Sequence, residues 1–566
     1  MKILKKYAKY FLKRIMFIRR LVRWWRLRTL YPCWDSIINN NRTLWNELLS
    51  AKKNNKILIA TSLGSHMPSV IMECMLAVAL TLRKSEVYVL LCDCSLEACQ
   101  DCSIDITIRE NELADGSTKK YLCRSCFKYA YKLYRSLGIK VHRYSEFLTS
   151  DNVESAGKLS ESIEFSKIKD YKLDNIAVGE HAMAGALRFY ARGNLEGQPY
   201  GDKVLRKYLK SALLTVYAIQ NLLKTYRFES ALFHHGIYVP QGLVGEVCRK
   251  NNLRVVNWNM AYKKSCFIFS HGDTYHHTLM NEPMEKWENI PWNNRMEKEL
   301  LDYLKSRWYG TRDWIWFHEK PNGNLKEITA ELKIDLSKPT IGMLTNVMWD
   351  AQLHYPANAF PNMMEWAVKT IDYFAKRPDL QLVIRVHPAE IWGKNPSRQK
   401  ILDELKKIYP VFPKNVYIIP PEARISTYAV MMECNAVIIY GTKTGVELTS
   451  VGIPVIVAGE SWIRNKKITL DASSVKEYFE ILDKLPLRFG MDEETILRAR
   501  KYAYHFFFRR MIPVKIMRPI ANWPLFKMDI ASLEDLMPDK YKALDVICDG
   551  IVKGSDFIYP AEKFEK

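Results

Sequence analysis

Short apolar runs alternate with helical segments between Thr340 and Val457, and this alternation constrains the fold more than any other feature of the sequence. Each run is a few residues long and apolar throughout, which is typical of parallel strands that are buried on both faces. Parallel strands need crossover connections, and the helical segments between the runs supply them. We expect strands at 340–344, 381–386, 416–419, 436–440 and 454–457, and helices at 360–374, 397–408, 426–432 and 444–451.

Two polar passages follow strands of this predicted sheet: RVHPAE at 385–390 and YGTKTGVE at 440–447. Ligands of open α/β sheets bind outside the carboxyl ends of the strands, so we expect both passages to lie in one crevice. A glycine-containing turn with hydroxyls and a lysine offers N–H groups and positive charge to a phosphate, as a sugar nucleotide requires. The candidate donor-binding residues are Asn346, Arg385, Glu390, Gly441, Thr442, Lys443, Thr444, Gly445 and Glu447. For Glu447 the alternative is an acid that stabilises the first turn of a helix.

The chain has 566 residues, more than one hydrophobic core usually supports, and its composition is 48% hydrophobic and 26% charged. These values describe a globular protein with two large domains. We expect the following organisation: an arm and linker at 1–53, a first α/β domain at 54–282 with a cysteine-rich insertion at 92–126, a connection at 283–338, a second α/β domain at 339–470, and C-terminal helices at 471–566 that cross back to brace the first domain.

Several side chains are candidates for acid–base chemistry in the crevice. His387 precedes a proline that fixes its turn, so its imidazole can donate a hydrogen bond to a leaving phosphate. His235 follows a strand of the first domain and can act as a base or bind the acceptor, although such a histidine often only bonds a loop. Glu180 and, if the crevice closes far enough, Asp350 are the other candidates for the base.

The spacing of four cysteines predicts a metal site. Cys99 and Cys102, and likewise Cys123 and Cys126, are separated by two residues, as in a zinc knuckle in which two tight turns each supply two thiolates. We expect structural zinc, because no residue nearby suggests that the metal takes part in chemistry. The alternatives are an iron–sulfur cluster, with Cys92 or Cys94 as a replacement ligand, and reduced buried thiols.

The formal charge of +22 is concentrated at the start of the chain, where residues 1–28 contain eleven Lys and Arg and no acid. Apolar residues recur there at three- and four-residue steps, which predicts an amphipathic helix suited to an anionic membrane surface. The alternative is a helix packed on the protein; nucleic acid is not expected, since no reading module accompanies the charge. The sequence contains no bilayer-spanning run and no signal peptide, so we expect a cytoplasmic protein on the inner face of the membrane.

The passages at 385–390 and 440–447, together with GIPVIVA at 452–458 and NVMWD at 346–350, resemble the donor half of bacterial capsule polysaccharide glycosyltransferases with the GT-B fold. The His-Pro pair and the glycine turn are also similar to sialyltransferases and Kdo transferases. The resemblance implies two Rossmann-like domains and sugar transfer from a nucleotide donor without a required metal. It implies that His387, Thr442 and Thr444 bind the donor phosphate, and that a carboxylate or histidine of the first domain deprotonates the acceptor.

One departure from the pattern leaves the donor base open. The CMP-sugar enzymes have adjacent Ser or Thr residues in the turn, whereas Lys443 separates two threonines here, so UDP- and GDP-sugars also remain candidates. We therefore expect a glycosyltransferase of surface polysaccharide synthesis that acts on a lipid-linked or glycan acceptor. The alternatives are a sugar-nucleotide epimerase of the same fold and a non-catalytic scaffold of a polysaccharide assembly complex.

Overall fold

The structure is a computed structural model that describes the chain apart from residues 1–24, 26–28, 31, 52, 54, 105, 117–118, 310, 316, 318–320, 336, 351–355, 522 and 565–566. The predicted amphipathic arm at 1–28 lies almost wholly outside the described residues. Among the helices in the described part of the chain, none is both long enough and apolar enough to cross a membrane.

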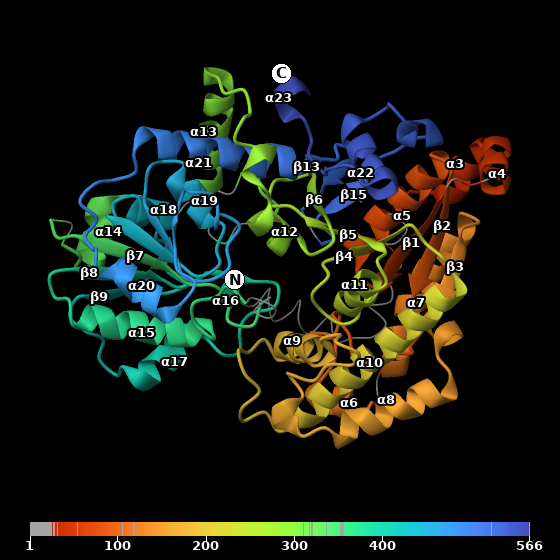
Figure 1. The fold of residues 1–566 in the computed structure, drawn as a ribbon, viewed down its shortest axis with the longest axis horizontal. Coiled ribbons are helices and arrows are strands. Elements are labelled where there is room, and N and C mark those ends of the chain that lie inside the picture. Colours follow the sequence, from red (N-terminus) through yellow and green to blue (C-terminus); the bar gives the residue numbers. More distant parts are fainter. Residues whose placement is uncertain are drawn as a thin grey trace.

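A seven-stranded sheet forms the core of the first half of the chain (Figure 1). Strands β1 to β5 pair in parallel in the order β5-β4-β1-β2-β3. Strand β6 pairs antiparallel with β5, and β13 pairs antiparallel with β6 at the edge of the sheet. The strands of this sheet are β1 Asn55–Ser62, β2 Ser85–Leu91, β3 Lys140–Arg143, β4 Ser230–His234, β5 Arg254–Met260, β6 Cys266–His271 and β13 Ile512–Pro513.

A six-stranded sheet forms the core of the second half, and all of its strands are parallel, in the order β12-β11-β10-β7-β8-β9. The five strands that the sequence predicts are all present, and the edge strand β12 is additional. Its strands are β7 Thr340–Leu344, β8 Gln381–Arg385, β9 Val416–Ile419, β10 Ala436–Ile439, β11 Val455–Val457 and β12 Leu470–Asp471; a separate hairpin pairs β14 Met517–Pro519 with β15 Phe526–Met528.

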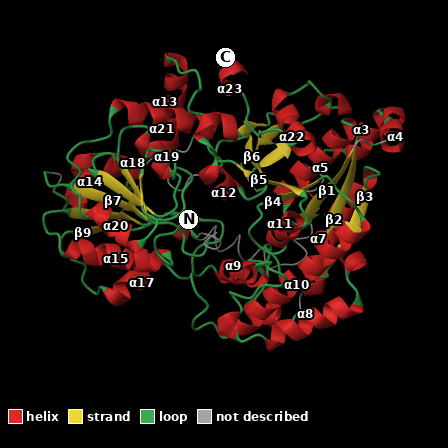
Figure 2. Cartoon of the chain, in the orientation of Figure 1, coloured by secondary structure: helices red, strands yellow, loops and turns green. Residues whose placement is uncertain are grey.

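Helices cover both faces of each sheet (Figure 2), and alternate strand residues pack on opposite faces. In β1, Ile57 and Ile59 belong to one apolar cluster, whereas Leu58 and Ala60 belong to another. The helices are α3 Trp34–Asn40, α4 Arg42–Ser50, α5 Met67–Leu82, α6 Glu110–Asp115, α7 Lys119–Ser136, α8 Ser150–Ser162, α9 Val178–Tyr190, α10 Gly201–Thr225, α11 Gln241–Lys250, α12 Tyr275–Asn281, α13 Asn294–Trp308, α14 Leu325–Leu332, α15 Met363–Ala375, α16 Ala389–Trp392, α17 Ile401–Ile408, α18 Thr427–Met431, α19 Thr444–Thr449, α20 Val475–Leu482, α21 Glu493–Tyr504, α22 Lys542–Lys553 and α23 Ala561–Phe564.

The C-terminal segment connects the two halves. Helix α21 packs on α19 of the second half, a π-helical turn at His505–Arg510 follows it, and α22 packs on α5 and β4 of the first half. Strand β13 joins the antiparallel edge of the first sheet through β6. A 3-10 turn at Leu533–Leu536 precedes α22.

Candidate functional site

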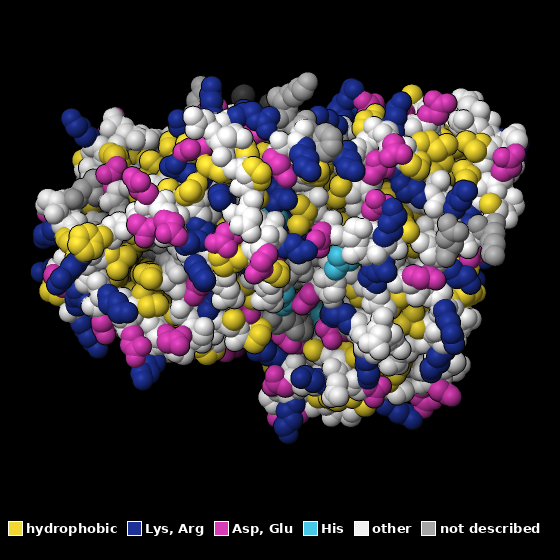
Figure 3. Space-filling view, turned by 45° about the horizontal axis from the view of Figure 1, so that its top comes forward, with side chains coloured by type: hydrophobic (Ala, Val, Ile, Leu, Met, Phe, Trp, Pro, Cys, Tyr) yellow, Lys and Arg dark blue, Asp and Glu magenta, His cyan; other side chains and the backbone are white. Residues whose placement is uncertain are grey.

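A cavity of about 1310 Å³ lies between the carboxyl ends of the two sheets. Its walls include residues that follow β1 and β4 of the first sheet and residues that follow β7, β8 and β10 of the second. Figure 3 shows histidine side chains in the hollow between the two halves. The crevice expected from the strand pattern is therefore present, and it is lined by both halves of the chain.

The turn at Gly441–Thr444 forms part of the second-sheet wall. A Cβ atom at Gly441 would lie 2.9 Å from the Glu460 carbonyl oxygen, so only glycine fits there without a shift. The hydroxyls of Thr442 and Thr444 are 3.2 Å apart, and the Thr444 N–H faces the Thr442 hydroxyl at 3.4 Å. The turn thus presents two hydroxyls at the cavity.

Lys443 is half-buried between the two halves of the chain. Its Nζ donates to Glu447 Oε1 at 3.1 Å and lies 4.7 Å from the centre of the Tyr262 ring. Burial and the nearby charge of Arg307 lower the pKa of Lys443, while Glu447 opposes this effect. The lysine lines the cavity, so its charge is available at the turn.

Glu447 and Gly445, both predicted to bind the donor, are not among the described residues that line the cavity. Glu447 is buried and pairs with Arg307 Nε at 3.1 Å as well as with Lys443. Burial alone would raise its pKa, but these two cations lower the pKa to about 2. A Cβ atom at Gly445 would lie 2.7 Å from Ile439 Cδ1, so this glycine permits close helix–strand packing. Both residues therefore support the turn from behind.

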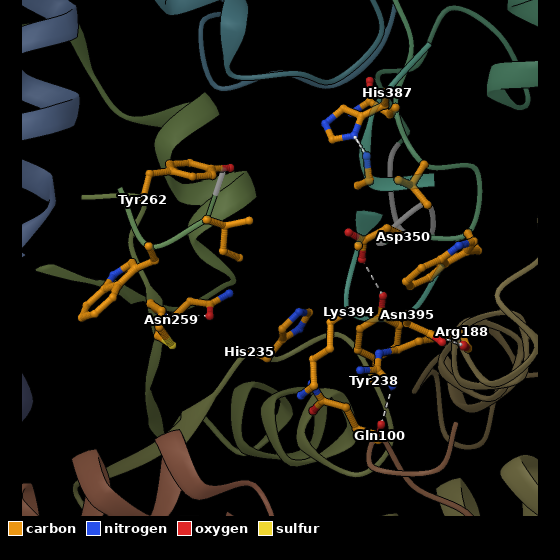
Figure 4. Close-up of a pocket in the computed structure, with 18 of the residues that line it drawn as sticks. Gln100, Arg188, His235, Tyr238, Asn259, Tyr262, Asp350, His387, Lys394 and Asn395 are labelled. Atoms are coloured by element: carbon orange, nitrogen blue, oxygen red, sulfur yellow. Dashed lines mark hydrogen bonds between the residues drawn. The ribbon is translucent and has the colours of Figure 1, made fainter. Parts of the chain in front are cut away.

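His387 lines the cavity at the end of β8. The Ala389 N–H donates to His387 Nδ1 at 3.1 Å, so a neutral imidazole carries its proton on Nε2. Burial and the charges of Lys443 and Arg385 lower the pKa of His387 to about 4, which keeps the ring neutral near pH 7. In Figure 4 the second ring nitrogen points toward the open centre of the cavity. His387 is thus oriented as a hydrogen-bond donor to a ligand.

Arg385 and Glu390 flank His387 in sequence but have other partners. The Arg385 guanidinium borders the cavity and donates to the carbonyl oxygens of Pro420 and Ala423, the latter at 3.2 Å, which fixes the loop after β9. Glu390 is fully buried and accepts the Ile401 N–H at 3.2 Å; burial raises its pKa to about 7. Glu390 is not among the described lining residues, so the structure does not place it on the donor.

His235 lies on the opposite, first-sheet wall. Its backbone has a φ of 68°, a left-handed conformation that is uncommon outside glycine, and its N–H donates to the Trp258 carbonyl at 2.9 Å. Strained backbone of this kind is concentrated at functional sites. Burial, together with the neighbouring His234 and Arg188, lowers the pKa of His235 well below its ordinary value. The imidazole is therefore neutral, with a nitrogen able to accept a proton.

Asp350 follows β7 and meets the first half of the chain across the cavity. The Tyr238 hydroxyl donates to Asp350 Oδ1 at 3.0 Å, as Figure 4 shows. The side chain of Asp350 is open to the cavity, but the protein around it displaces water and raises its pKa, an effect that Tyr238 and Arg188 partly offset. Asn346, from the same loop, lines the cavity, and its Oδ1 is buried without a hydrogen-bond partner among the described residues.

Glu180, the remaining candidate for the base, lies in the first turn of α9 and is half-buried. It is not among the described residues that line the cavity. Arg188, near the other end of the same helix α9, lines the cavity instead. The structure therefore brings His387, His235 and Asp350 together but leaves Glu180 apart.

The four cysteines of the predicted knuckle also line the cavity. Cys99 and Cys102 form a tight turn in which the Cys102 N–H donates to the Cys99 carbonyl at 2.9 Å, and their sulfur atoms are 4.0 Å apart. Cys123 and Cys126 lie in helix α7 and not in the second tight turn that the spacing predicts. The Ser65 N–H and hydroxyl donate to Cys126 Sγ at 3.1 and 3.2 Å. In the described part of the chain, no group of three or more potential ligands is assembled around a metal position.

Three lining residues carry no sequence motif and were not predicted: Arg188, Lys394 and Trp523. Arg188 donates to the Gln100 carbonyl, and its guanidinium lies 5.2 Å from the centre of the Tyr238 ring. Lys394 Nζ lies 3.4 Å from the centre of the Trp523 ring. The sequence gives little indication of these three residues, because Arg188 lies in the last turn of a helix and Lys394 and Trp523 lie in loops.

Comparison with known proteins gives matches among solved structures only. No family model matches the chain, and neither does any curated protein. Similar structures include KpsC from Thermosulfurimonas dismutans, a β-Kdo 2,4-transferase, at 11% identity over 51% of this chain and 83% of that chain, with a TM-score of 0.32. The β-Kdo 2,7-transferase of the same organism matches at 11% identity over 57% and 90%, with a TM-score of 0.31. UDP-GlcNAc 2-epimerase from Neisseria meningitidis, bound to UDP-GlcNAc, matches at 10% identity over 79% and 97%, with a TM-score of 0.23.

The groups that the sequence resembles, Kdo transferases and GT-B glycosyltransferases, are thus among the structural neighbours of the chain. The epimerase fold that the sequence left as an alternative is a neighbour as well. Similarity of this extent carries no argument about activity, so the function is argued from the geometry of the cavity.

Proposed function

We propose that the chain is a glycosyltransferase that moves a sugar from a nucleotide-activated donor to a membrane-associated glycan acceptor in surface polysaccharide synthesis. The observation that supports this most is the composition of the cavity walls. Groups suited to a phosphate occupy the second-sheet wall, and a neutral histidine suited to taking a proton occupies the first-sheet wall. Sugar transfer requires both, because the leaving phosphate gains charge while the acceptor hydroxyl loses a proton.

The donor phosphate would lie against the turn at Gly441–Thr444. The hydroxyls of Thr442 and Thr444 and the ammonium of Lys443 can donate to its oxygen atoms, and the glycine permits close approach. His387 would donate its Nε2–H to the leaving oxygen, where negative charge develops. These protein groups can stabilise that charge themselves, so we propose transfer that does not require a catalytic metal.

His235 is the proposed base. Its ring is neutral, it faces the cavity from the first-sheet wall, and its strained backbone is held by the bond to Trp258. Asp350 is engaged by the Tyr238 hydroxyl and belongs to the donor half, so we assign it a role in orienting Tyr238 and the acceptor. A neutral imidazole opposite the donor can take the proton of an acceptor hydroxyl as the sugar is transferred.

Thermal unfolding with CMP, UDP, GDP and their common sugars tests the proposal. One nucleotide class should raise the midpoint of the wild type and of the control His142→Ala, whose ring lies outside the cavity, but not that of His387→Ala. His235→Ala should keep this shift and lose sugar transfer by about 100-fold or more, the lower range for removing a general base. Because the pKa of His387 is about 4, nucleotide affinity should be retained from pH 8 down to pH 5.

Several outcomes would contradict the proposal. If no nucleotide raises the unfolding midpoint of the wild type, the result favours the non-catalytic scaffold. If the protein epimerises a sugar nucleotide without an acceptor, the result favours the epimerase. A several-fold rise in affinity for the sugar nucleotide between pH 7 and pH 5.5 that is absent in His387→Ala would show that His387 becomes an imidazolium near its ordinary pKa and is not held as a neutral donor.

We also propose that Cys99, Cys102, Cys123 and Cys126 hold a structural zinc ion. Two thiolates on one tetrahedral zinc ion lie about 3.8 Å apart, given a Zn–S distance of about 2.3 Å, and Cys99 and Cys102 are 4.0 Å apart in a tight turn. Cys126 lies close enough to Cys99 for their charges to interact. The ion would tie the loop after β2 to helix α7.

Elemental analysis of the purified protein should find about one zinc per chain. The Cys99→Ser/Cys102→Ser double variant should lose it, whereas Cys33→Ser, which changes an exposed cysteine away from the cluster, should keep it. Iron with a visible chromophore would favour the iron–sulfur alternative. Equal zinc content in both variants, or no metal in the wild type, would exclude the proposed site.

The basic arm at 1–28 is proposed to hold the enzyme at an anionic membrane surface, where a lipid-linked acceptor lies. Its eleven cations and apolar periodicity support this, since each cation near an anionic surface adds about 1 kcal/mol of attraction. The full chain should sediment with liposomes that contain anionic lipid and not with neutral ones, and deletion of residues 2–28 should abolish sedimentation. Undiminished sedimentation of the truncated chain would assign the anchor elsewhere.

A further inference from the structure

The first-sheet wall of the cavity carries a cluster of histidines that the proposed chemistry does not fully use. His66 follows β1, and His234 and His235 come at the end of β4, so two strands deliver them to one place. The rings of His66 and His234 are stacked with centroids 4.6 Å apart, and the His234 and His235 centroids are 5.6 Å apart. We call these three residues the histidine wall.

The hydrogen bonds of the histidine wall are to neutral groups. His66 Nδ1 and the Ser69 hydroxyl are 2.6 Å apart, which leaves His66 Nε2 for the cavity. His234 Nε2 lies 3.2 Å from Asn259 Oδ1, an oxygen identified as the acceptor because it also accepts the Met260 N–H at 2.9 Å. His234 therefore donates through Nε2, and burial of the ring lowers its pKa and favours the neutral form. No carboxylate among the described residues is hydrogen-bonded to the three rings.

The charges that act on the pKa values of the three rings are those of cations and of other histidines, whereas the buried carboxyl of Glu73 accepts the His234 backbone N–H behind the wall. Burial lowers the pKa of all three rings, and Lys394 and Arg188 lower the pKa of His66 further. Arg188 forms no ion pair within the described part of the chain; it donates to the Gln100 carbonyl and packs over the Tyr238 ring. The positive charge of an arginine at a cavity wall is not neutralised by the protein when no carboxylate pairs with it.

The acids that border this part of the cavity have partners of their own. Asp350 accepts the Tyr238 hydroxyl, and Asp101 accepts the Ser65 hydroxyl beside the cysteines. Arg188 lowers the pKa of Asp350 through its charge, but the two are not joined by an ion pair. Arg188 therefore lies on the same cavity lining as the proposed base without an ion-pair partner among the described residues; Figure 4 shows Arg188, His235 and Asp350 around the cavity.

We propose that the histidine wall and Arg188 bind an oxyanion, the carboxylate or phosphate of an acidic acceptor glycan, beside the hydroxyl that receives the sugar. The inference rests on the proposed function, since it names the class of acceptor for that site. The Arg188 guanidinium can bind two oxygen atoms of such a group, and His66 Nε2 can donate a further hydrogen bond. Trp523, which lies against His66 with ring centroids 5.7 Å apart, offers an apolar face to the sugar ring that carries the charge.

Lys394 completes the site from the other half of the chain. It is exposed, and its Nζ lies over the Trp523 ring. An acidic sugar between Trp523 and Arg188 would thus be close to cations of both halves. Because the carboxylate of a uronic acid and the phosphate of a sugar phosphate offer the same oxygen geometry to these groups, both are tested.

Three sugars of matched shape serve as probes: D-glucuronate, D-glucose 6-phosphate and neutral D-glucose. Ligand-observed NMR titrations should show that at least one anionic sugar binds the wild type about tenfold or more tightly than glucose, as expected for a charge-assisted hydrogen bond. Arg188→Gln should weaken the anion by about tenfold, and Lys394→Gln, at an exposed position, should also weaken it. Arg143→Gln, a matched loss of charge outside the cavity, should bind like the wild type.

Two cross-checks with His387→Ala and Arg188→Gln separate this site from the donor site. His387→Ala should keep the anionic sugar, and Arg188→Gln should keep the nucleotide-induced rise in the thermal midpoint, which also shows that the variant is folded. Equal binding of glucose and the anionic sugars, equal binding by Arg188→Gln and Arg143→Gln, or loss of the anion in His387→Ala would each overturn the proposal. Absence of any nucleotide-induced shift in the wild type is a different result, because it counts against the glycosyltransferase function itself.

Discussion

The buried carboxylate of Glu282 joins three parts of the chain, and the cavity depends on how these parts are joined. It accepts His505 Nε2 at 2.8 Å and pairs with Arg510, both from the C-terminal crossing, while its backbone carbonyl accepts Lys466 Nζ of the second half at 2.8 Å. Burial would raise the pKa of Glu282, but Arg510 and His505 lower it to about 2, so the group stays ionised near pH 7. Removing one partner of such a buried pair costs about 3–5 kcal/mol, and here it would also loosen the two sheets.

Because the two halves of the chain are held together, residues that are distant in sequence form hydrogen bonds and ion pairs with each other at the cavity. His277 of α12 bonds Asp273 on its own side and lies 3.2 Å from Glu460 on the other. Burial would lower the pKa of His277, but these two carboxylates raise it to about 10 and keep it charged. Tyr238 and Asp350 form a second link across the cavity. Neither half of the chain alone lines the whole cavity.

The sequence was sufficient for the parallel core strands of both sheets and for one side of the site. It was not sufficient for the strands β6, β12 and β13, or for side-chain orientations that depend on distant partners. Apolar runs identify buried strands, and parallel topology places His387, Thr442 and His235 at the carboxyl ends, where the structure has them. Glu447 turns inward because Arg307, 140 residues earlier in the chain, is buried beneath it. No local pattern reveals such a pair. Strand β13 is only two residues long, too short for a periodic pattern of apolar residues to predict it. The other strands of its sheet end at His271, far earlier in the chain, so the sequence does not predict the pairing either.

We propose that a nucleotide-linked sugar binds between the two sheets, against the wall formed by the second sheet. Hydrogen–deuterium exchange measured with and without the nucleotide that stabilises the protein tests this directly, because each amide reports its own protection. With the nucleotide bound, we expect slower amide exchange in peptides that cover 345–350, 385–390 and 440–447, and little change in the helices on the outer faces of the sheets. Protection confined to other segments, or none in these three at saturating nucleotide, would contradict it.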